Sequence, residues 1–254
     1  RFRGRIMFPI SDSSWRVIYF SGRILKDDGQ SAKYLNSPDT PLFDKSAVLF
    51  GLDKAKSYVR RLDYSILVEG QMDLIMSHQA GVKNTVAASG TALTDAERNK
   101  AGVVNNLGML RRLSSNVIIA FDSDEDGRKA AMRAARIALS LGMDVKVAEI
   151  TGGDPAGSCK AKDPADLVLN DPEDWKNALR KAKPVVEFEL NNVLKEVTEP
   201  RKVPKALRER VFPFVAAVES QTDKAFFVKM ISEKTGLPEQ AIWEDIHSLV
   251  AKMK

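Results

Sequence analysis

Short apolar runs separated by turn residues dominate the first part of the chain. Two of them, RIMFPI (5–10) and WRVIYFSGRIL (15–25), are rich in the β-branched and aromatic residues that favour strands. A stretch rich in glycine, asparagine and proline follows, and a helical pattern begins only at Leu52 and runs to Arg61. The pattern predicts a small, mixed β-rich subdomain over residues 1–61.

The hydrophobic pattern changes at residue 62, where short apolar strands begin to alternate with helical segments. Strand–helix alternation at this spacing implies right-handed crossovers and a mostly parallel sheet flanked by helices, over residues 62–170. The expected strands are Ser65–Val68, 84–89, Asn116–Phe121 and 144–150, and the expected helices are Gln71–Ala80, Thr94–Leu113 and Arg128–Leu141.

From residue 171 the pattern is helical to the end. Asp171 and Pro172 have the order of a helix N-cap followed by proline at the first helical position. Prolines and a glycine divide the rest, which predicts a helical subdomain over residues 171–254. The expected helices there are Val185–Val197, Lys205–Glu219, Lys224–Thr235 and Glu239–Lys252. The predicted fold class is therefore α/β, with a β-rich subdomain in front and a helical one behind.

Composition narrows the class of protein. The chain has 254 residues and one cysteine, Cys159, so this segment has no internal disulfide and no cysteine-based zinc site. No apolar run approaches the roughly 18 residues of a membrane span, so we expect no membrane partner and a reducing cytoplasmic setting. The chain starts inside a strand-like run without an initiator methionine, which is typical of an excerpt from a longer protein.

The charge is unevenly distributed. Residues 1–61 contain twelve lysines and arginines against six acidic residues, a net charge of +6, whereas the whole chain carries +5. A basic lobe followed by acidic residues suits a polyanionic partner whose chemistry needs a metal ion.

Acidic residues follow three of the predicted strands. Glu69-Gly70 with Asp73 comes after the first, Asp122 and Asp124 after the strand ending at Phe121, and Asp163 with Asp166 after the last. Carboxyl ends of parallel strands meet at one edge of a sheet, where ligands bind. Carboxylates gathered there repel each other unless cations compensate, and hard oxygen ligands suit Mg²⁺.

The acidic residues also allow two other interpretations. A single aspartate after a strand is commonly a turn or helix cap, but three acidic motifs at three strand ends are harder to explain in that way. The run DSDEDG also matches the start of an EF-hand loop. Its twelfth position would be Arg133 where a bidentate glutamate is required, and the segment before it is a strand, so the EF-hand interpretation fails.

The motifs resemble those of a known family. EGxxD (69–73) followed by DxD (122–124) and Gly127-Arg128 resembles the Toprim signature. The segments RFRGRIMFPI, SGRIL, KYLNSPDTPLFDK, LFGLDKAK, ASGTALT and KDPADLV resemble the polymerase domain of bacterial DnaG-type DNA primases. The resemblance implies a Toprim-type fold and metal-dependent joining of ribonucleotides on a single-stranded DNA template, for DNA replication.

Carried over residue by residue, the resemblance assigns roles to the acidic residues. It implies that Glu69 is the catalytic acid/base or metal-organising carboxylate, that Asp122 and Asp124 are catalytic metal ligands, and that Asp163 is a further ligand. The family often shows D-P-D, whereas this chain has one more residue before Asp166, which either joins the metal site or caps the next helix. Asp126, where the family usually has a small residue, is expected to be exposed rather than an outer ligand.

The basic lobe receives its roles from the same resemblance. The resemblance implies that Lys33 and Lys45 are the strongest candidates to bind the incoming triphosphate, followed by Arg23 and Asn36. It implies that Arg3, Arg5 and Tyr34 contact the template. From composition alone, the segment around Asn36 would be an ordinary turn and Lys45 a solvated charge. Position within a matched motif favours the binding roles.

The resemblance also implies cofactors and partners. We expect Mg²⁺, replaceable by Mn²⁺ and of undetermined number, and a monomeric core that binds single-stranded DNA and ribonucleoside triphosphates. A replicative helicase is the expected partner of a domain outside this segment. The alternatives are another Toprim enzyme, such as a nuclease or topoisomerase fragment, and a catalytically weak module that binds single-stranded DNA. The four tyrosines all precede or begin the Toprim region, which disfavours a topoisomerase.

Overall fold

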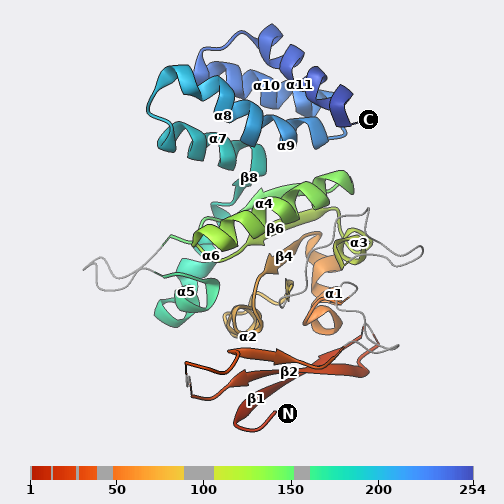
Figure 1. Cartoon of the computed structure of the whole chain (residues 1–254). Coiled ribbons are helices and arrows are strands. Elements are labelled where there is room, and N and C mark those ends of the chain that lie inside the picture. Colours follow the sequence, from red (N-terminus) through yellow and green to blue (C-terminus); the bar gives the residue numbers. More distant parts are fainter. Residues whose placement is uncertain are drawn as a thin grey trace.

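The computed structural model of the chain describes residues 2–12, 14–26, 29–38, 48–88, 106–151 and 161–253. Figure 1 shows three stacked tiers: a small sheet near the N-terminus, a central sheet with helices, and a tier of helices near the C-terminus. This arrangement confirms the expected α/β class, with a β-rich part in front and helices behind.

The small sheet is antiparallel, with the strand order β1-β2-β3. Its strands are β1 (Arg5–Ser11), β2 (Val17–Ile24) and β3 (Tyr34–Asn36). Because successive side chains of a strand point to opposite faces, Ser21, Arg23, Tyr34 and Asn36 share one face through the pairings Ser21–Asn36 and Arg23–Tyr34. Ser21 on this face accepts a hydrogen bond from the Gln71 amide of the central tier, at 3.1 Å between Nε2 and Oγ. The face is therefore turned toward the central tier.

The central sheet has the strand order β5-β4-β6-β7-β8, and its first four strands run parallel, as expected. Its edge strand β8 pairs antiparallel with β7 and was not predicted. The strands are β4 (Ser65–Val68), β5 (Thr85–Ala87), β6 (Asn116–Ala120), β7 (Asp144–Val147) and β8 (Lys183–Pro184). The helices beside them are α1 (Leu52–Leu62), α2 (Gln71–Gln79), α3 (Asn106–Arg111), α4 (Glu125–Ser140), α5 (Pro164–Asn170) and α6 (Pro172–Arg180).

Both faces of this sheet are buried, which explains the continuous apolar run of β4. Leu67 belongs to the core that includes residues of α1, α3 and α4. Ile66 and Val68 belong to the opposite core, together with residues of α2, α5 and α6. The amino-terminal part of the helix expected over Thr94–Leu113 lies outside the described residues, and only its end is seen, as α3.

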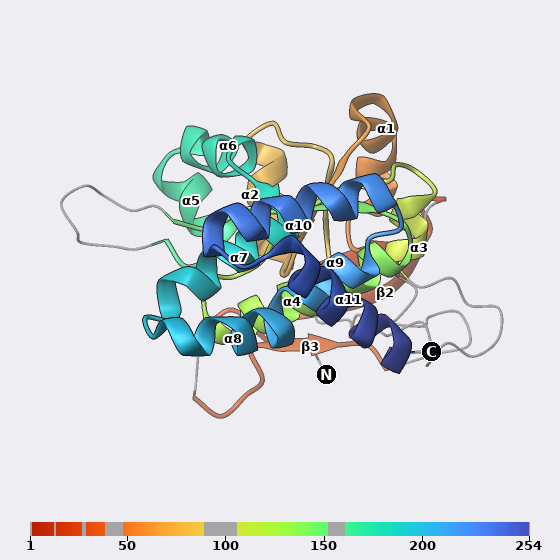
Figure 2. The ribbon, with the colours of Figure 1, turned by 90° about the horizontal axis from the view of Figure 1, so that it is seen from above.

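The helical tier lies over α4, as Figure 2 shows from above. Its α-helices are α7 (Val185–Glu196), α8 (Val203–Arg210), α9 (Phe212–Ala217), α10 (Gln221–Thr235) and α11 (Glu239–Met253). The prediction of a single helix over Lys205–Glu219 is wrong, because α8 ends at Arg210 and a separate helix, α9, follows with a proline in its first turn. Pro213 has no N–H to donate to residue 209, so the α-helical ladder stops there. Within the part of the chain that the structure describes, none of the helices combines the length and apolar character that a membrane span requires.

Candidate active site

Two of the acidic motifs leave the central sheet at the same edge. β4 and β6 are parallel neighbours in which Val68 lies opposite Ala120, the last residue of each strand. Glu69 follows β4 directly, and Asp122 comes two residues after the end of β6. The structure therefore brings Glu69 and Asp122 to the carboxyl edge of the sheet, where open α/β sheets bind their ligands.

Asp124 is fixed by the first turn of α4. It is the N-cap of this helix, and its Oδ1 accepts a hydrogen bond of 2.7 Å from the amide of Gly127. A Cβ on Gly127 would lie 2.5 Å from the carbonyl oxygen of Asp122, so only glycine lets the helix turn approach the chain this closely. Asp126 is exposed in the same turn, as expected.

The third acidic motif lies at the start of α5. Asp163 is its N-cap and accepts a hydrogen bond of 2.7 Å from the amide of Asp166. The Oδ2 of Asp166 in turn accepts a 3.0 Å bond from the amide of Lys162. Both aspartates therefore hold the start of α5, and the role of Asp166 as a metal ligand remains a prediction.

Hydrogen bonds join the three motifs to each other. Ser123, between the aspartates of the second motif, donates from its amide (2.8 Å) and its hydroxyl (3.1 Å) to the carbonyl of Lys162. Asp73 accepts from the amides of Gly70 (2.9 Å) and Ala165 (3.2 Å), which links the first motif to the third. The motifs thus form one unit, as their positions at strand ends predicted.

Asp73 is the residue that sequence reasoning left without a role. Its side chain is buried and lies at the third position of α2, four residues after Glu69. Its place in EGxxD was the available signal, but a carboxylate in the first turn of a helix is also favoured by the helix dipole alone. The contact with Ala165, 92 residues away in the sequence, shows that Asp73 belongs with the other carboxylates.

The electrostatics confirm that these carboxylates lie near each other; we call Glu69, Asp73, Asp122, Asp124 and Asp163 the carboxylate cluster. Burial, followed by the charges of Asp73, Glu69, Asp163 and Asp124, raises the pKa of Asp122 to about 7. Burial and then the charge of Asp163 raise the pKa of Asp73 to about 6, although its two backbone hydrogen bonds act in the other direction. The pKa of Glu69 is also raised, by burial and then by Asp124 and Asp126.

The cluster fits a hard divalent cation by its chemistry. Glu69 Oε2 and Asp122 Oδ1 are buried and have no hydrogen-bond partner, and both are anionic oxygens of the kind that Mg²⁺ prefers. Within the described ranges of the chain, no three acidic, histidine or cysteine side chains converge into a ready-made metal site. A site with few pre-arranged protein ligands suits Mg²⁺, because this ion takes one or two carboxylates and completes its coordination with water and substrate phosphates.

The basic lobe faces this cluster through β3. Burial raises the pKa of Tyr34, the charge of Arg23 lowers it, and the charges of Asp73 and Asp163 raise it further. The Arg23 guanidinium lies 5.8 Å from the centre of the Tyr34 ring. Asn36, on the same face, has a buried Oδ1 without a hydrogen-bond partner. Arg23, Tyr34 and Asn36 are thus brought together on the face turned toward the central tier.

The other basic candidates are Arg3, Arg5, Lys33 and Lys45. Arg3 and Lys33 are exposed, and Lys45 lies outside the described residues. Arg5 donates from Nη1 to the carbonyls of Gly22 (3.0 Å) and Ala32 (2.8 Å), so it holds the sheet to the segment before β3. This structural use of Arg5 was not expected.

A pocket of about 250 Å³ lies beside Asp122 and reaches α7. Its lining includes Asp122, Arg128, Phe188 and Asn192. A larger pocket of about 570 Å³, lined by Tyr64, Asn116 and Asp144, lies at the amino ends of the strands, away from the cluster. The strand-end rule therefore favours the carboxylate edge as the active site.

Comparisons with known proteins agree with this geometry. Two family models match: the N-terminal domain of the DNA primase catalytic core over residues 1–56 and the Toprim domain over residues 63–149. A DNA primase of Clostridium acetobutylicum is 34% identical over 256 residues, which cover 99% of this chain. The chain spans only 39% of the length of that relative.

Solved structures show the same likeness. A DNA primase domain from Pseudomonas aeruginosa has a TM-score of 0.76 and 33% identity, with 97% of this chain and 73% of that chain covered. The DnaG primase catalytic domain bound to single-stranded DNA has a TM-score of 0.75 and 30% identity, with coverages of 95% and 72%.

Proposed function

The chain belongs to the DnaG-type DNA primases, matching their catalytic core, and from this premise we propose that it synthesises short RNA primers on a single-stranded DNA template. The observation that carries the proposal is the carboxylate cluster, whose three motifs are hydrogen-bonded together opposite a basic lobe. The reaction would be nucleotidyl transfer from ribonucleoside triphosphates.

The acidic residues supply the metal-binding part. We assign Glu69, Asp122 and Asp124 to hold Mg²⁺, with Asp163 and Asp166 as further ligands and Asp73 as the residue that ties the motifs together. Once bound, the metal would neutralise phosphate charge and stabilise the leaving pyrophosphate. The unpartnered oxygens of Glu69 and Asp122 support this assignment, because burying anionic oxygens without a partner is costly unless a cation compensates.

The chain's other residues would place the substrates. Arg23, Lys33, Lys45 and Asn36 are assigned to the incoming triphosphate, and Arg3, Arg5 and Tyr34 to the template.

The expected partners follow from the family. A related catalytic domain has been solved bound to single-stranded DNA, which supports such a template here. A replicative helicase, engaged by a domain outside this segment, remains part of the proposal. A DNA template also fits the expected cytoplasmic location.

A template-dependent assay tests the proposal. The chain is incubated with labelled ribonucleoside triphosphates, Mg²⁺ and a single-stranded DNA oligonucleotide, and the products are separated by length. We expect short RNA products that require the template, and a loss of about 10²-fold or more in Glu69→Gln and in Asp122→Asn. Glu125→Gln is the matched control, because Glu125 is an exposed carboxylate in the turn after Asp124 and forms an exposed ion pair with Lys129.

Other outcomes would point to other Toprim chemistry. Cleavage or relaxation of DNA by this chain, without polymerisation, would overturn the proposal in favour of a nuclease or topoisomerase fragment. The chain would be only a binding module if it bound single-stranded DNA while the parent and all variants gave the same RNA signal with and without template.

A further inference from the structure

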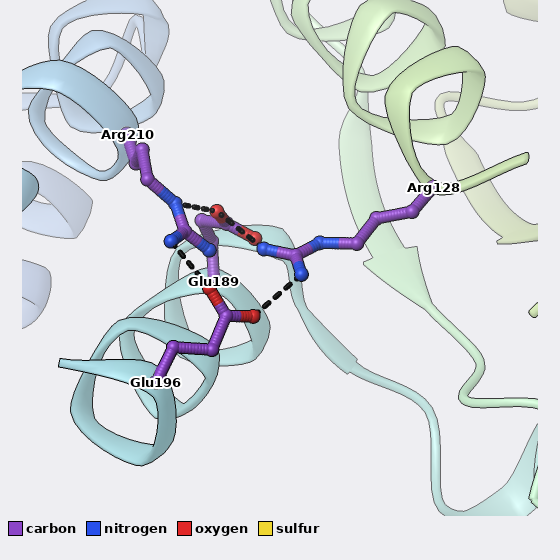
Figure 3. Close-up of polar contacts among 4 residues, drawn as sticks. All are labelled: Arg128, Glu189, Glu196 and Arg210. Carbon is purple, nitrogen blue, oxygen red and sulfur yellow. Dashed lines mark hydrogen bonds and ion pairs between the residues drawn. The ribbon is translucent and has the colours of Figure 1, made fainter. Parts of the chain in front are cut away.

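Two arginines and two glutamates form a closed ring of ion pairs between α4 and the helical tier (Figure 3). Arg128 donates to Glu196 Oε1 (2.5 Å) and Glu189 Oε1 (3.3 Å). Arg210 donates to the same glutamates, to Glu189 Oε1 (2.7 Å) and Glu196 Oε2 (2.6 Å). Each glutamate therefore bridges both arginines.

The four residues come from three helices and differ in burial. Arg128 lies on α4, the glutamates lie seven residues apart on one face of α7, and Arg210 ends α8. The Glu189 side chain is only 4% exposed, whereas those of Arg128 and Arg210 are 35% and 29% exposed. Arg128 is thus the ring's one member from the central tier.

The ring fixes geometry more than it adds stability. Buried ion pairs lose most of their Coulomb energy to desolvation, and well-packed apolar residues often stabilise a fold as well. Glu189 Oε2 and Arg210 Nη2 are buried without a hydrogen-bond partner, so the ring is not fully satisfied. An apolar core already joins α4 to the helical tier through Ala134, Ala138 and Phe214. The ring adds orientation, because the two planar guanidinium groups fix the position of the start of α4 relative to α7.

The start of α4 is also the part of the active site that carries the second acidic motif. Arg128 donates its backbone amide to the carbonyl of Asp124 at 3.0 Å, one helical turn before it. Asp122 and Arg128 line the same small pocket as Phe188 and Asn192 of α7. A shift of Arg128 would therefore move the turn that presents Asp122 and Asp124.

We propose that Arg128 is a positioning residue: its guanidinium, held by Glu189 and Glu196, lets the helical tier fix the turn that presents Asp122 and Asp124. Its Nη1 and Nη2 donate to these two carboxylates and would not serve as a ligand of substrate phosphate. The role of the two aspartates rests on the proposed function, whereas the ring and its hold on α4 do not.

Hydrogen exchange tests the hold without metal or substrate. In the metal-free chain, the backbone amides of residues 124–128 are followed in the parent and in Arg128→Gln, Glu196→Gln and Lys129→Gln. We expect exchange about fivefold faster in the first two variants and unchanged in the third. Lys129→Gln is the matched control, because it removes a neighbouring charge that forms an exposed ion pair with Glu125. Glu196→Gln tests the ring from the side of α7. In this variant Glu189 can still pair with both arginines.

Mn²⁺ titration calorimetry then tests the consequence for the site. We expect the Kd for Mn²⁺ to rise about tenfold in Arg128→Gln and in Glu196→Gln, the lower end of what the loss of a supporting residue costs a metal site. The double variant should be no weaker than either single one, because both act through one ring. Lys129→Gln should bind as the parent does.

The outcomes separate the explanations. Unchanged exchange in Arg128→Gln or Glu196→Gln would overturn the hold on α4. Faster exchange with an unchanged Kd for Mn²⁺ would show that the ring supports the fold but does not position the site. A nucleotide-binding defect in Arg128→Gln that Glu196→Gln lacks would make Arg128 a phosphate ligand instead. A parent chain that does not bind Mn²⁺ at all would count against the proposed function, while hydrogen exchange still decides the ring.

Discussion

Within the carboxylate cluster, the carboxyl group of Asp122 has the most strongly raised pKa. This shift in pKa predicts how the stability of the chain depends on pH. Its pKa is raised from 3.8 to about 7, so the folded chain holds this proton more tightly than the unfolded chain. The stabilising contribution is present below about pH 4 and is lost as the pH rises through about 7. In the metal-free chain, the ionised Asp122 therefore lowers the free energy of unfolding at high pH.

Asp122→Asn should remove this loss of stability at high pH, because asparagine does not ionise. We expect the variant to be more stable than the parent by roughly 1–2 kcal/mol at about pH 8, after allowance for solvent screening, and by less at about pH 4.5. Urea denaturation at both pH values with a chelator present measures the difference. The opposing titration of His78, whose pKa is lowered by burial, is common to both proteins and cancels. Equal stability at high pH would refute the argument.

Gly127 tests how closely α4 must approach Asp122. Alanine at this helical position would normally stabilise by about 1 kcal/mol. Here its Cβ would lie 2.5 Å from the carbonyl oxygen of Asp122, and a backbone obstacle cannot rotate away. Overpacking of this kind costs about 1–3 kcal/mol, so the clash should win. We expect Gly127→Ala to unfold at lower urea concentration and to bind Mn²⁺ more weakly, whereas Arg133→Ala, on an exposed position of α4, should do neither.

At the scale of elements, one buried hydrogen bond connects the small sheet to the central tier. Gln71 at the start of α2 donates to Ser21 of β2 at 3.1 Å, and both residues are buried. Gln71→Leu or Ser21→Ala alone leaves a buried polar partner unsatisfied, which should cost about 1–3 kcal/mol. The double variant replaces both partners and should cost little more than either single one. Denaturation of the four proteins measures this coupling, and strictly additive losses would contradict it.

Elements were predictable where hydrophobic period and flanking residues agreed. β4 and β6 are short apolar runs that end at acidic residues, and their parallel pairing followed from the alternation with helices. The break between α8 and α9 was missed because the apolar pattern continues through Pro213, which is tolerated in the first turn of a new helix. β8 has only two residues, and its pairing depends on β7 rather than on its own sequence.

The site was predictable to the extent that it is local. The positions of Glu69 and Asp122 at one sheet edge follow from strand order and direction. The use of Asp73 depends on Ala165, and that of Arg128 on two residues of α7, so neither is readable from neighbouring residues. Arg5 shows the converse: its motif suggested DNA, and its Nη1 donates to the backbone carbonyls of Gly22 and Ala32.

At the scale of the whole molecule, the distribution of charge predicts where a nucleic acid backbone lies. Residues 1–61 carry a net charge of +6, more than the +5 of the whole chain. The face with Arg23 and Tyr34 is turned toward the carboxylate cluster, because the charges of Asp73 and Asp163 reach Tyr34. A single strand bound there would contact cations of the basic lobe, while the helical tier would contribute little.

Salt dependence measures this contribution directly. Each phosphate neutralised on a single strand adds about −0.7 to the slope of log K against log salt concentration. We expect Arg3→Gln, which removes an exposed cation assigned to the template, to reduce the slope by about that amount and to weaken binding of a labelled single-stranded DNA oligonucleotide, measured by fluorescence anisotropy. Lys205→Gln, an exposed lysine of α8 with 80% of its side chain accessible, should change neither. If Lys205→Gln reduced the slope and Arg3→Gln did not, the strand would cross the helical tier, and the basic lobe would be an ordinary solvated surface.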